Sequence, residues 1–170
     1  MTRQRDHRPW IQRFLFPRLT RRFFIRFAIV VVCAYMVFGH LLVLMRIRGA
    51  SMDPTYRDGG FTFCWRQRYA FSPPARGDVV AIALSGPSVL YLKRVVGVEN
   101  DTIEFRHGTL FVNGSEWKEP YVKHPYDWTW PERTIREGHI YVVGDNRAMS
   151  TDAHTFGETP VSRVAGAPLW

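Results

Sequence analysis

The sequence predicts a mostly β protein in which a β domain follows a single N-terminal transmembrane helix. One observation is the apolar run over residues 27–45, whose 19 residues are close to the ~20 that cross a bilayer as a helix. The other is the chain after Ser51, where short runs of β-branched and aromatic residues alternate with turn sequences. The sequence shows no internal repeat and no low-complexity segment.

The basic character of the chain is concentrated before the apolar run. Residues 1–26 carry eight arginines and one aspartate, a net charge of +7 out of +8 for the whole 170 residues. The rest is nearly neutral, which argues against nucleic acid as a partner of the folded domain. Basic residues that flank a transmembrane helix stay on the cytoplasmic side of the membrane. We therefore predict a cytoplasmic tail over 1–26 and an extracytoplasmic domain over 46–170. Arg46 and Arg48 weaken this bias without matching it.

We interpret the apolar run 27–45 as an uncleaved signal anchor. It is longer than the apolar core of ~7–15 residues in a cleavable signal peptide, and no clean small-x-small cleavage sequence follows it. The alternative is a buried helix of a soluble domain. Such a helix would be expected to show a polar stripe, which residues 27–45 lack.

Six runs after the anchor have the composition of β-strands. They are residues 61–65, 79–84, 89–98, 102–105, 109–112 and 139–143. Asn113-Gly114 is a strong hairpin signal, whereas residues 115–137 are irregular, polar and aromatic. The cysteines and histidines show no metal-ligand spacing, so the sequence predicts neither a metal site nor a cofactor.

The segment Gly49-Ala50-Ser51-Met52-Asp53-Pro54-Thr55 lies where the chain would re-enter water after the anchor. A serine at this place can act as a nucleophile only if a base removes its proton. Otherwise Ser51 is a turn residue before Pro54. The histidines after the anchor do not stand in a recognisable triad setting, which leaves a lysine as the candidate base.

Lys93 is that candidate because it lies inside the apolar run 89–98. Strand alternation puts Lys93 and Arg94 on opposite faces, so one of them should point inward. Burial disfavours the ammonium form and lowers the pKa from about 10.4, at which only about one lysine in a few thousand is neutral at pH 7. The alternative is a lysine that reaches solvent at the strand edge.

Four segments, in this order, resemble those of the type I signal peptidases, the Ser/Lys membrane peptidases. They are 51–55 (SMDPT), 76–80 (RGDVV), 92–97 (LKRVVG) and 144–152 (GDNRAMSTD) with the following 156–157 (FG). Residues 108–114 are similar to the family's hairpin, and the resemblance covers 46–170. It implies an antiparallel β-sheet catalytic domain of the signal peptidase type. A small insert with a short β-hairpin would occupy 99–137, between the lysine segment and the final segment.

The resemblance also implies a role for each matched residue. Ser51 would be the acylating nucleophile, with its own N–H donating to the oxyanion, and Lys93 would be the general base. Ser150 would orient the lysine amine, and Met52 would line the substrate groove. Structural support would come from Asp145, Asn146 and Asp152.

Two positions depart from the family pattern. Gly49 stands where some members carry a second serine that joins the oxyanion hole, so the second donor is unassigned. His154 stands where the family usually has Arg. It either pairs with Asp152, which would make the site sensitive to pH, or is simply exposed.

The predicted function is a membrane-anchored serine endopeptidase that removes signal peptides from exported preproteins at the outer face of the inner (plasma) membrane. The substrate would bind extended along a strand, with shallow pockets for small side chains next to the cleavage site. Two alternatives stay open. One is a specialised maturation peptidase of the same family, for a pilin or in an organellar inner membrane. The other is a non-catalytic membrane-anchored domain that binds peptides.

The predicted partners are preproteins and the lipid bilayer. A set of aromatic side chains could rest on the membrane interface, where amphipathic rings are favoured, or belong to the sheet core. These are Phe61, Phe63, Trp65, Trp128 and Trp130.

Overall fold

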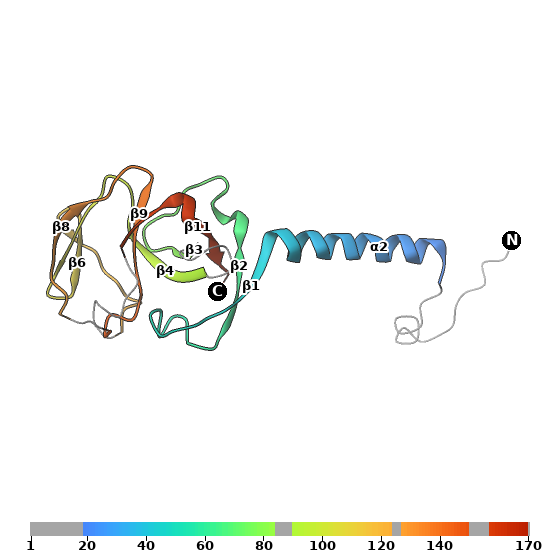
Figure 1. The fold of residues 1–170 in the computed structure, drawn as a ribbon, viewed down its shortest axis with the longest axis horizontal. Helices are drawn as coiled ribbons and strands as arrows, with labels where there is room; N and C mark the ends of the chain where they lie inside the picture. Colours follow the sequence, from blue (N-terminus) through green and yellow to red (C-terminus); the bar gives the residue numbers. More distant parts are fainter. Residues whose placement is uncertain (1–18, 84–89, 124–126, 150–156, 170) are drawn as a thin grey trace. The chain divides into compact units, whose positions relative to one another are not determined.

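The structure is a computed structural model that describes residues 19–83, 90–123, 127–149 and 157–169 (Figure 1). The chain forms two units, Met1–His40 and Leu41–Trp170. The described part of the first unit is helical, and the second unit is built mainly from β-strands. The prediction of a mostly β protein with one N-terminal apolar helix is therefore confirmed.

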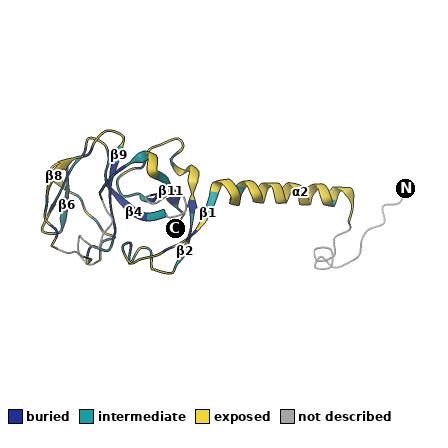
Figure 2. Ribbon diagram, in the orientation of Figure 1, coloured by how far each residue is buried: buried dark blue, intermediate teal, exposed yellow. Residues whose placement is uncertain are grey.

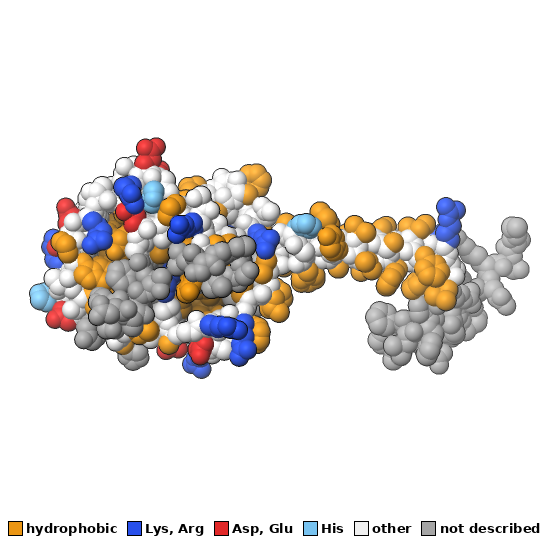
Figure 3. Space-filling model, in the orientation of Figure 1, with side chains coloured by type: hydrophobic (Ala, Val, Ile, Leu, Met, Phe, Trp, Pro, Cys, Tyr) orange, Lys and Arg blue, Asp and Glu red, His pale blue; other side chains and the backbone are white. Residues whose placement is uncertain are grey.

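Helix α2 spans Arg21–Met36, and a π-helical turn, η1, continues it over Val37–Leu41. Thr20 caps its start, because its Oγ1 accepts a hydrogen bond of 3.3 Å from the Phe23 N–H. No residue of either segment is buried, and hydrophobic side chains cover the helix along its length (Figures 2 and 3). The 21 residues Arg21–Leu41 are long and apolar enough to cross a membrane.

The prediction of one apolar helix over 27–45 is wrong at its C-terminal end. Residues 42–45 belong to strand β1, and the helix begins earlier, at Arg21. The apolar run continues without a break from the helix into the strand. Hydropathy alone does not mark the point where the backbone conformation changes.

The larger sheet has seven antiparallel strands in the order β1-β2-β11-β3-β4-β9-β10. Their bounds are β1 Leu42–Arg46, β2 Phe61–Trp65, β3 Val79–Ala83, β4 Leu90–Gly97, β9 His139–Val143, β10 Gly157–Pro160 and β11 Val164–Pro168. Short 3-10 helices, η2 Arg66–Tyr69 and η4 Val161–Arg163, precede β3 and β11. β11 fits between β2 and β3 at Gly166, where a Cβ would collide with the Trp65 carbonyl.

The smaller sheet has four strands in the order β7-β6-β5-β8. They are β5 Thr102–Arg106, β6 Thr109–Val112, β7 Ser115–Glu116 and β8 Trp130–Thr134. The hairpin predicted at Asn113-Gly114 is thus present between β6 and β7, and the sheet continues from β6 through β5 to β8. The description of 115–137 as irregular is wrong for β7 and β8. The strand β8 is mostly exposed and contains Pro131, so it lacks the alternation that marks a half-buried strand.

Two hydrophobic clusters matter for the candidate site. One joins the smaller sheet to β4 and β9 and includes Trp128, with Trp130 packed against it. The other consists of Met45, Ile47, Met52, Cys64, Ala81 and Leu92. Figure 2 shows the buried residues concentrated on β4 and β9. Of the five aromatic residues singled out above, the Trp128–Trp130 pair lies in core packing, while Phe61 and Trp65 are exposed.

Candidate active site

Ser51 and Lys93 are 42 residues apart in the sequence and meet in the fold. The Lys93 Nζ donates a hydrogen bond of 2.7 Å to the Ser51 Oγ. Lys93 lies on β4 opposite Val80 of β3, and only 2% of its surface is exposed. Ser51 lies in the turn between β1 and β2 and is half-buried. The pair therefore has the geometry for direct proton transfer between a hydroxyl and an amine.

Burial decides the protonation of Lys93. The loss of solvent lowers the pKa of Lys93 from 10.5 to about 8, and the nearby Asp145 carboxylate opposes this shift. With a pKa of about 8, roughly one molecule in ten holds a neutral amine at pH 7. A neutral amine is the form that can accept the serine proton.

The turn that carries Ser51 is anchored by the side chain next to it. Met52 is 2% exposed and packs in the cluster with Met45 and Leu92. The backbone forms a turn at this residue, because the Tyr56 N–H donates a hydrogen bond of 2.9 Å to the Met52 carbonyl. The buried methionine thus fixes the position of the neighbouring hydroxyl.

Asn146 fixes the same turn from the other side. Its N–H donates to the Ser51 carbonyl and its Nδ2 donates to the Ala50 carbonyl, both at 3.0 Å. The serine segment is therefore tied to a residue more than 90 positions further along the chain.

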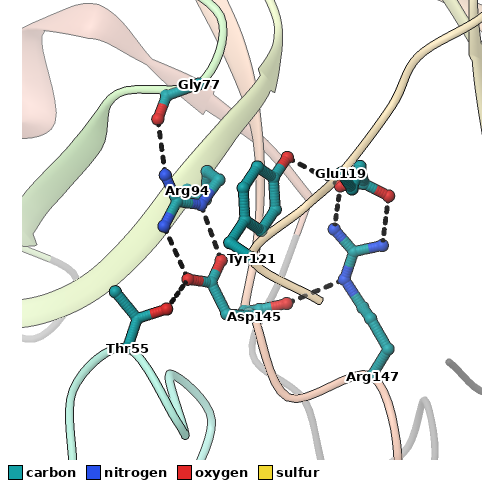
Figure 4. Close-up of polar contacts among 8 residues, drawn as sticks. Thr55, Gly77, Arg94, Glu119, Tyr121, Asp145 and Arg147 are labelled. Carbon is teal, nitrogen blue, oxygen red and sulfur yellow. Dashed lines mark hydrogen bonds and ion pairs between the residues drawn. The ribbon is translucent and has the colours of Figure 1, made fainter. Parts of the chain in front are cut away.

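Asp145 lies at the centre of a buried polar network (Figure 4). The Arg94 Nε and Nη2 donate to its two oxygens at 2.7 and 2.6 Å, and the Thr55 Oγ1 donates at 2.6 Å. The Arg94 Nη1 donates to the Gly77 carbonyl, and the guanidinium stacks on the Tyr121 ring at 3.8 Å. This network joins the segments that carry four of the matched motifs.

The expectation that only one of Lys93 and Arg94 points inward is wrong, because both are buried. Strand β4 is covered on both faces, so alternation does not lead either side chain to solvent. Lys93 faces Ser51, whereas Arg94 faces Asp145.

A second buried ion pair was not predicted from the sequence. Arg147 is 2% exposed and donates from Nη1 and Nη2 to both carboxylate oxygens of Glu119. Its Nε donates to the Gly144 carbonyl at 2.8 Å. The pair joins the insert to the segment that contains Asp145 and Asn146. Nothing in the local sequence marks these two residues as partners.

Three of the residues singled out from the sequence lie outside the described residues. They are Ser150, Asp152 and His154. Their roles in orienting the lysine and supporting the final segment stay predictions.

Gly49 has a backbone conformation that disfavours a serine at this position, where the resemblance suggested a possible second oxyanion donor. Its φ is +89°, a region that residues with a side chain rarely adopt, and its N–H donates to the Asp58 Oδ1 at 2.8 Å. The Ser51 N–H makes no hydrogen bond to any described residue. Of the two donors considered, it is the one that stays available to an oxyanion.

A groove with a volume of about 650 Å³ runs beside the serine. One wall is formed by β1 and the residues that follow it, and the other by Leu90, Tyr91 and Leu92 of β4. Ser51 and Met52 also line it. β1 is the outermost strand of its sheet, so its free edge can accept an extended chain.

Comparison with known proteins gives consistent matches. A family model described as signal peptidase, peptidase S26, matches residues 20–169. The chain is similar to signal peptidase I of Bacillus licheniformis, with 32% identity over 81% of this chain and 80% of that protein. It is 30% identical to signal peptidase I of Leptolyngbya laminosa over 71% of this chain and 63% of that protein.

A plant protein is similar to the same degree. The chain is 31% identical to thylakoidal processing peptidase 1, chloroplastic, of Arabidopsis thaliana over 73% of this chain. The match spans 40% of the plant protein. It also spans less than two thirds of the Leptolyngbya protein.

Proposed function

This chain belongs to the signal peptidase family of serine-type peptidases, S26, and from that membership we propose that it is a membrane-anchored endopeptidase that removes signal peptides from exported preproteins. The observation that carries the proposal is the 2.7 Å contact between the Ser51 hydroxyl and the buried Lys93 amine. A non-catalytic peptide-binding domain would need the groove but not this pair.

The proposed reaction starts from neutral Lys93. Its Nζ accepts the Ser51 proton while the Ser51 Oγ forms a bond to the scissile carbonyl carbon. The Ser51 N–H donates to the oxyanion of the tetrahedral intermediate, a contribution of roughly 3–4 kcal/mol to the barrier. The intermediate collapses, the C–N bond breaks, and the leaving amine takes the proton from the Lys93 ammonium. An acyl-enzyme ester on Ser51 remains.

The second half of the reaction reverses these roles. Lys93 accepts a proton from a water molecule as the water oxygen attacks the ester carbonyl. The C–Oγ bond then breaks, and the proton returns from Lys93 to the Ser51 Oγ. Ser150 is proposed to hold the lysine amine in line during both steps. Neither a metal nor a cofactor enters this scheme.

The groove supports a substrate that binds as an extended strand. The free edge of β1 can pair with the backbone of the preprotein. Met52 and Leu92 are buried and help to line the groove beside Ser51. Small side chains next to the cleaved bond are proposed to rest against them.

The segment Arg21–Leu41 is proposed as a single-pass anchor in the cell inner (plasma) membrane. The basic residues before it would lie in the cytoplasm, and the sheet domain would lie on the extracytoplasmic face. The exposed Phe61 and Trp65 would then be available to the lipid interface. The proposal keeps the order tail, anchor and catalytic domain, with the anchor placed at Arg21–Leu41 in place of residues 27–45.

The proposal is tested with the full chain in detergent and a purified preprotein. Ser51→Ala should lower the rate of signal peptide release by a factor on the order of 10⁴ or more, because the attacking oxygen is lost. Ser162→Ala, which removes an exposed hydroxyl from η4, is the matched control and should cleave like the wild type. Cleavage by Ser51→Ala at the wild-type rate would refute the assignment.

The same assay separates the alternatives. Wild-type protein that cleaves no preprotein but still binds one would favour the non-catalytic domain. Cleavage of a single precursor from a panel of secreted, pilin and organellar precursors would favour a specialised peptidase. The similarity to a chloroplastic relative is the reason to include an organellar precursor.

The pKa of Lys93 predicts the pH dependence of cleavage. Because the base must be neutral and its pKa is about 8, kcat/KM should rise about tenfold per pH unit below pH 8 and level off above it. The measurement uses a peptide substrate without titratable side chains between pH 5.5 and 10, with tryptophan fluorescence to verify that the protein stays folded. A rise that continues up to pH 10, without levelling off near pH 8, would show that the pKa of Lys93 is not lowered as the structure indicates.

A further inference from the structure

Three arginines line the groove that contains Ser51. They are Arg46, Arg48 and Arg66, all of them exposed. No aspartate or glutamate is among the described residues that line the groove. The groove walls are otherwise mostly apolar, so the three guanidinium groups dominate its charge.

The described part of the chain does not compensate the charge of these arginines. None of the three forms an ion pair or a hydrogen bond through its side chain with a described residue. Other arginines do pair with carboxylates; they are Arg76, Arg94, Arg106, Arg136 and Arg147. Asp58 contacts the groove lining through the Gly49 N–H, without pairing with the three arginines. The groove therefore offers an unsatisfied positive potential to whatever enters it.

The three positions are spread along the path of an extended chain. Arg48 is three residues from Ser51, so their Cα atoms lie within about 11 Å of each other. Arg46 ends β1, and Arg66 follows Trp65, which pairs with Leu42 at the opposite end of that strand. A peptide strand advances about 3.3 Å per residue, so Arg48 is within reach of side chains about three residues from the scissile bond.

We propose that Arg46, Arg48 and Arg66 make the groove selective for charge. Preproteins with Asp or Glu within about five residues of the cleavage site are favoured, and preproteins with Lys or Arg there are disfavoured. The three arginines attract an acidic substrate and repel a basic one. Both effects therefore increase the ratio of kcat/KM for the acidic substrate to kcat/KM for the basic substrate. The inference rests on the proposed function, because Ser51 defines where the cleavage site lies in the groove.

The test uses matched peptides that differ only in Glu, Gln or Lys, placed three or five residues from the cleaved bond on either side. At low salt the wild type should cleave the best Glu peptide about tenfold faster, in kcat/KM, than the Lys peptide, and 0.5 M NaCl should reduce this ratio. The triple variant Arg46→Gln/Arg48→Gln/Arg66→Gln should reduce the ratio below about twofold while still cleaving the Gln peptide. Arg163→Gln, which removes an exposed charge outside the groove, should keep the full ratio.

A binding measurement keeps this inference separate from the proposed function. Ser51→Ala should bind the Glu peptide more tightly than the Lys peptide, and the triple substitution in the same background should remove the difference. Equal Kd values and equal kcat/KM values for the two peptides would overturn the charge selectivity and leave the peptidase assignment intact. A triple variant that loses activity only on vesicles with anionic lipids, with no peptide preference in detergent, would assign the arginines to lipid headgroups and also overturn the inference.

Discussion

Replacing Lys93 with methionine should abolish preprotein cleavage and leave the protein folded. Methionine is similar in length and apolar, so it fills the site in β4 where Lys93 is almost fully buried. It cannot accept the proton of Ser51, and we expect kcat to fall by a factor on the order of 10³ or more. Lys93→Arg should be equally inactive, because a guanidinium does not become neutral at any usable pH.

Two readouts distinguish a lost base from a damaged fold. The free energy of unfolding of Lys93→Met, measured with urea and tryptophan fluorescence, should equal or exceed that of the wild type, since a buried amine is removed. Lys93→Cys treated with bromoethylamine should recover activity, because the reaction restores an amine at nearly the same distance. Cys33→Ser removes the exposed competing thiol for that experiment. A fully folded Lys93→Met that cleaves at a tenth of the wild-type rate or faster would contradict the role of Lys93.

Asp145→Ala should lower the free energy of unfolding by about 3–5 kcal/mol. The substitution leaves the Arg94 guanidinium buried without its carboxylate, and it also removes the acceptor of the Thr55 hydroxyl. Remaining activity should shift to lower pH, because Asp145 raises the pKa of Lys93. Urea unfolding followed by tryptophan fluorescence measures the first effect, and kcat/KM against pH measures the second.

Matched variants test whether the loss of stability in Asp145→Ala comes from the buried, unpaired charge of Arg94. Thr55→Val removes one hydrogen bond to the same carboxylate and should cost about 1 kcal/mol. The double variant Asp145→Leu/Arg94→Met removes both charges and should be less destabilised than Asp145→Ala. An Asp145→Ala protein within about 1 kcal/mol of the wild type would show that the pair contributes little to the fold.

The strands that the sequence predicts well are rich in β-branched and aromatic residues, whether their burial alternates, as in β2, β5 and β6, or is nearly continuous, as in β3, β4 and β9. β2, β6 and β9 have the predicted bounds, and β3, β4 and β5 differ by one residue at one or both ends. β10 and β11 were missed because their residues, Gly157–Pro160 and Val164–Pro168, carry glycine and proline in place of a hydrophobic pattern. β1 was missed for the opposite reason, since its apolar residues are continuous with those of the helix.

The candidate site was predictable in part for similar physical reasons. The order of the matched segments and the lysine in an apolar strand were enough to select Ser51 and Lys93. The burial of Arg94 could not be predicted, because alternation implies one solvent-facing side and β4 has none. The Arg147–Glu119 pair depends on how the insert packs against the segment after β9, which no local pattern encodes.

Strand β11 is made of residues close to the C-terminus, yet it lies between β2 and β3 in the middle of the larger sheet. Among the described strands, β11 is the link that pairs β2, and through it β1, with the part of the sheet that carries Lys93. The strand that unites the two halves of the sheet is therefore synthesised after both Ser51 and Lys93. The 2.7 Å contact between the Lys93 amine and the Ser51 hydroxyl thus depends on a strand that joins the sheet only after both of its partners have been made.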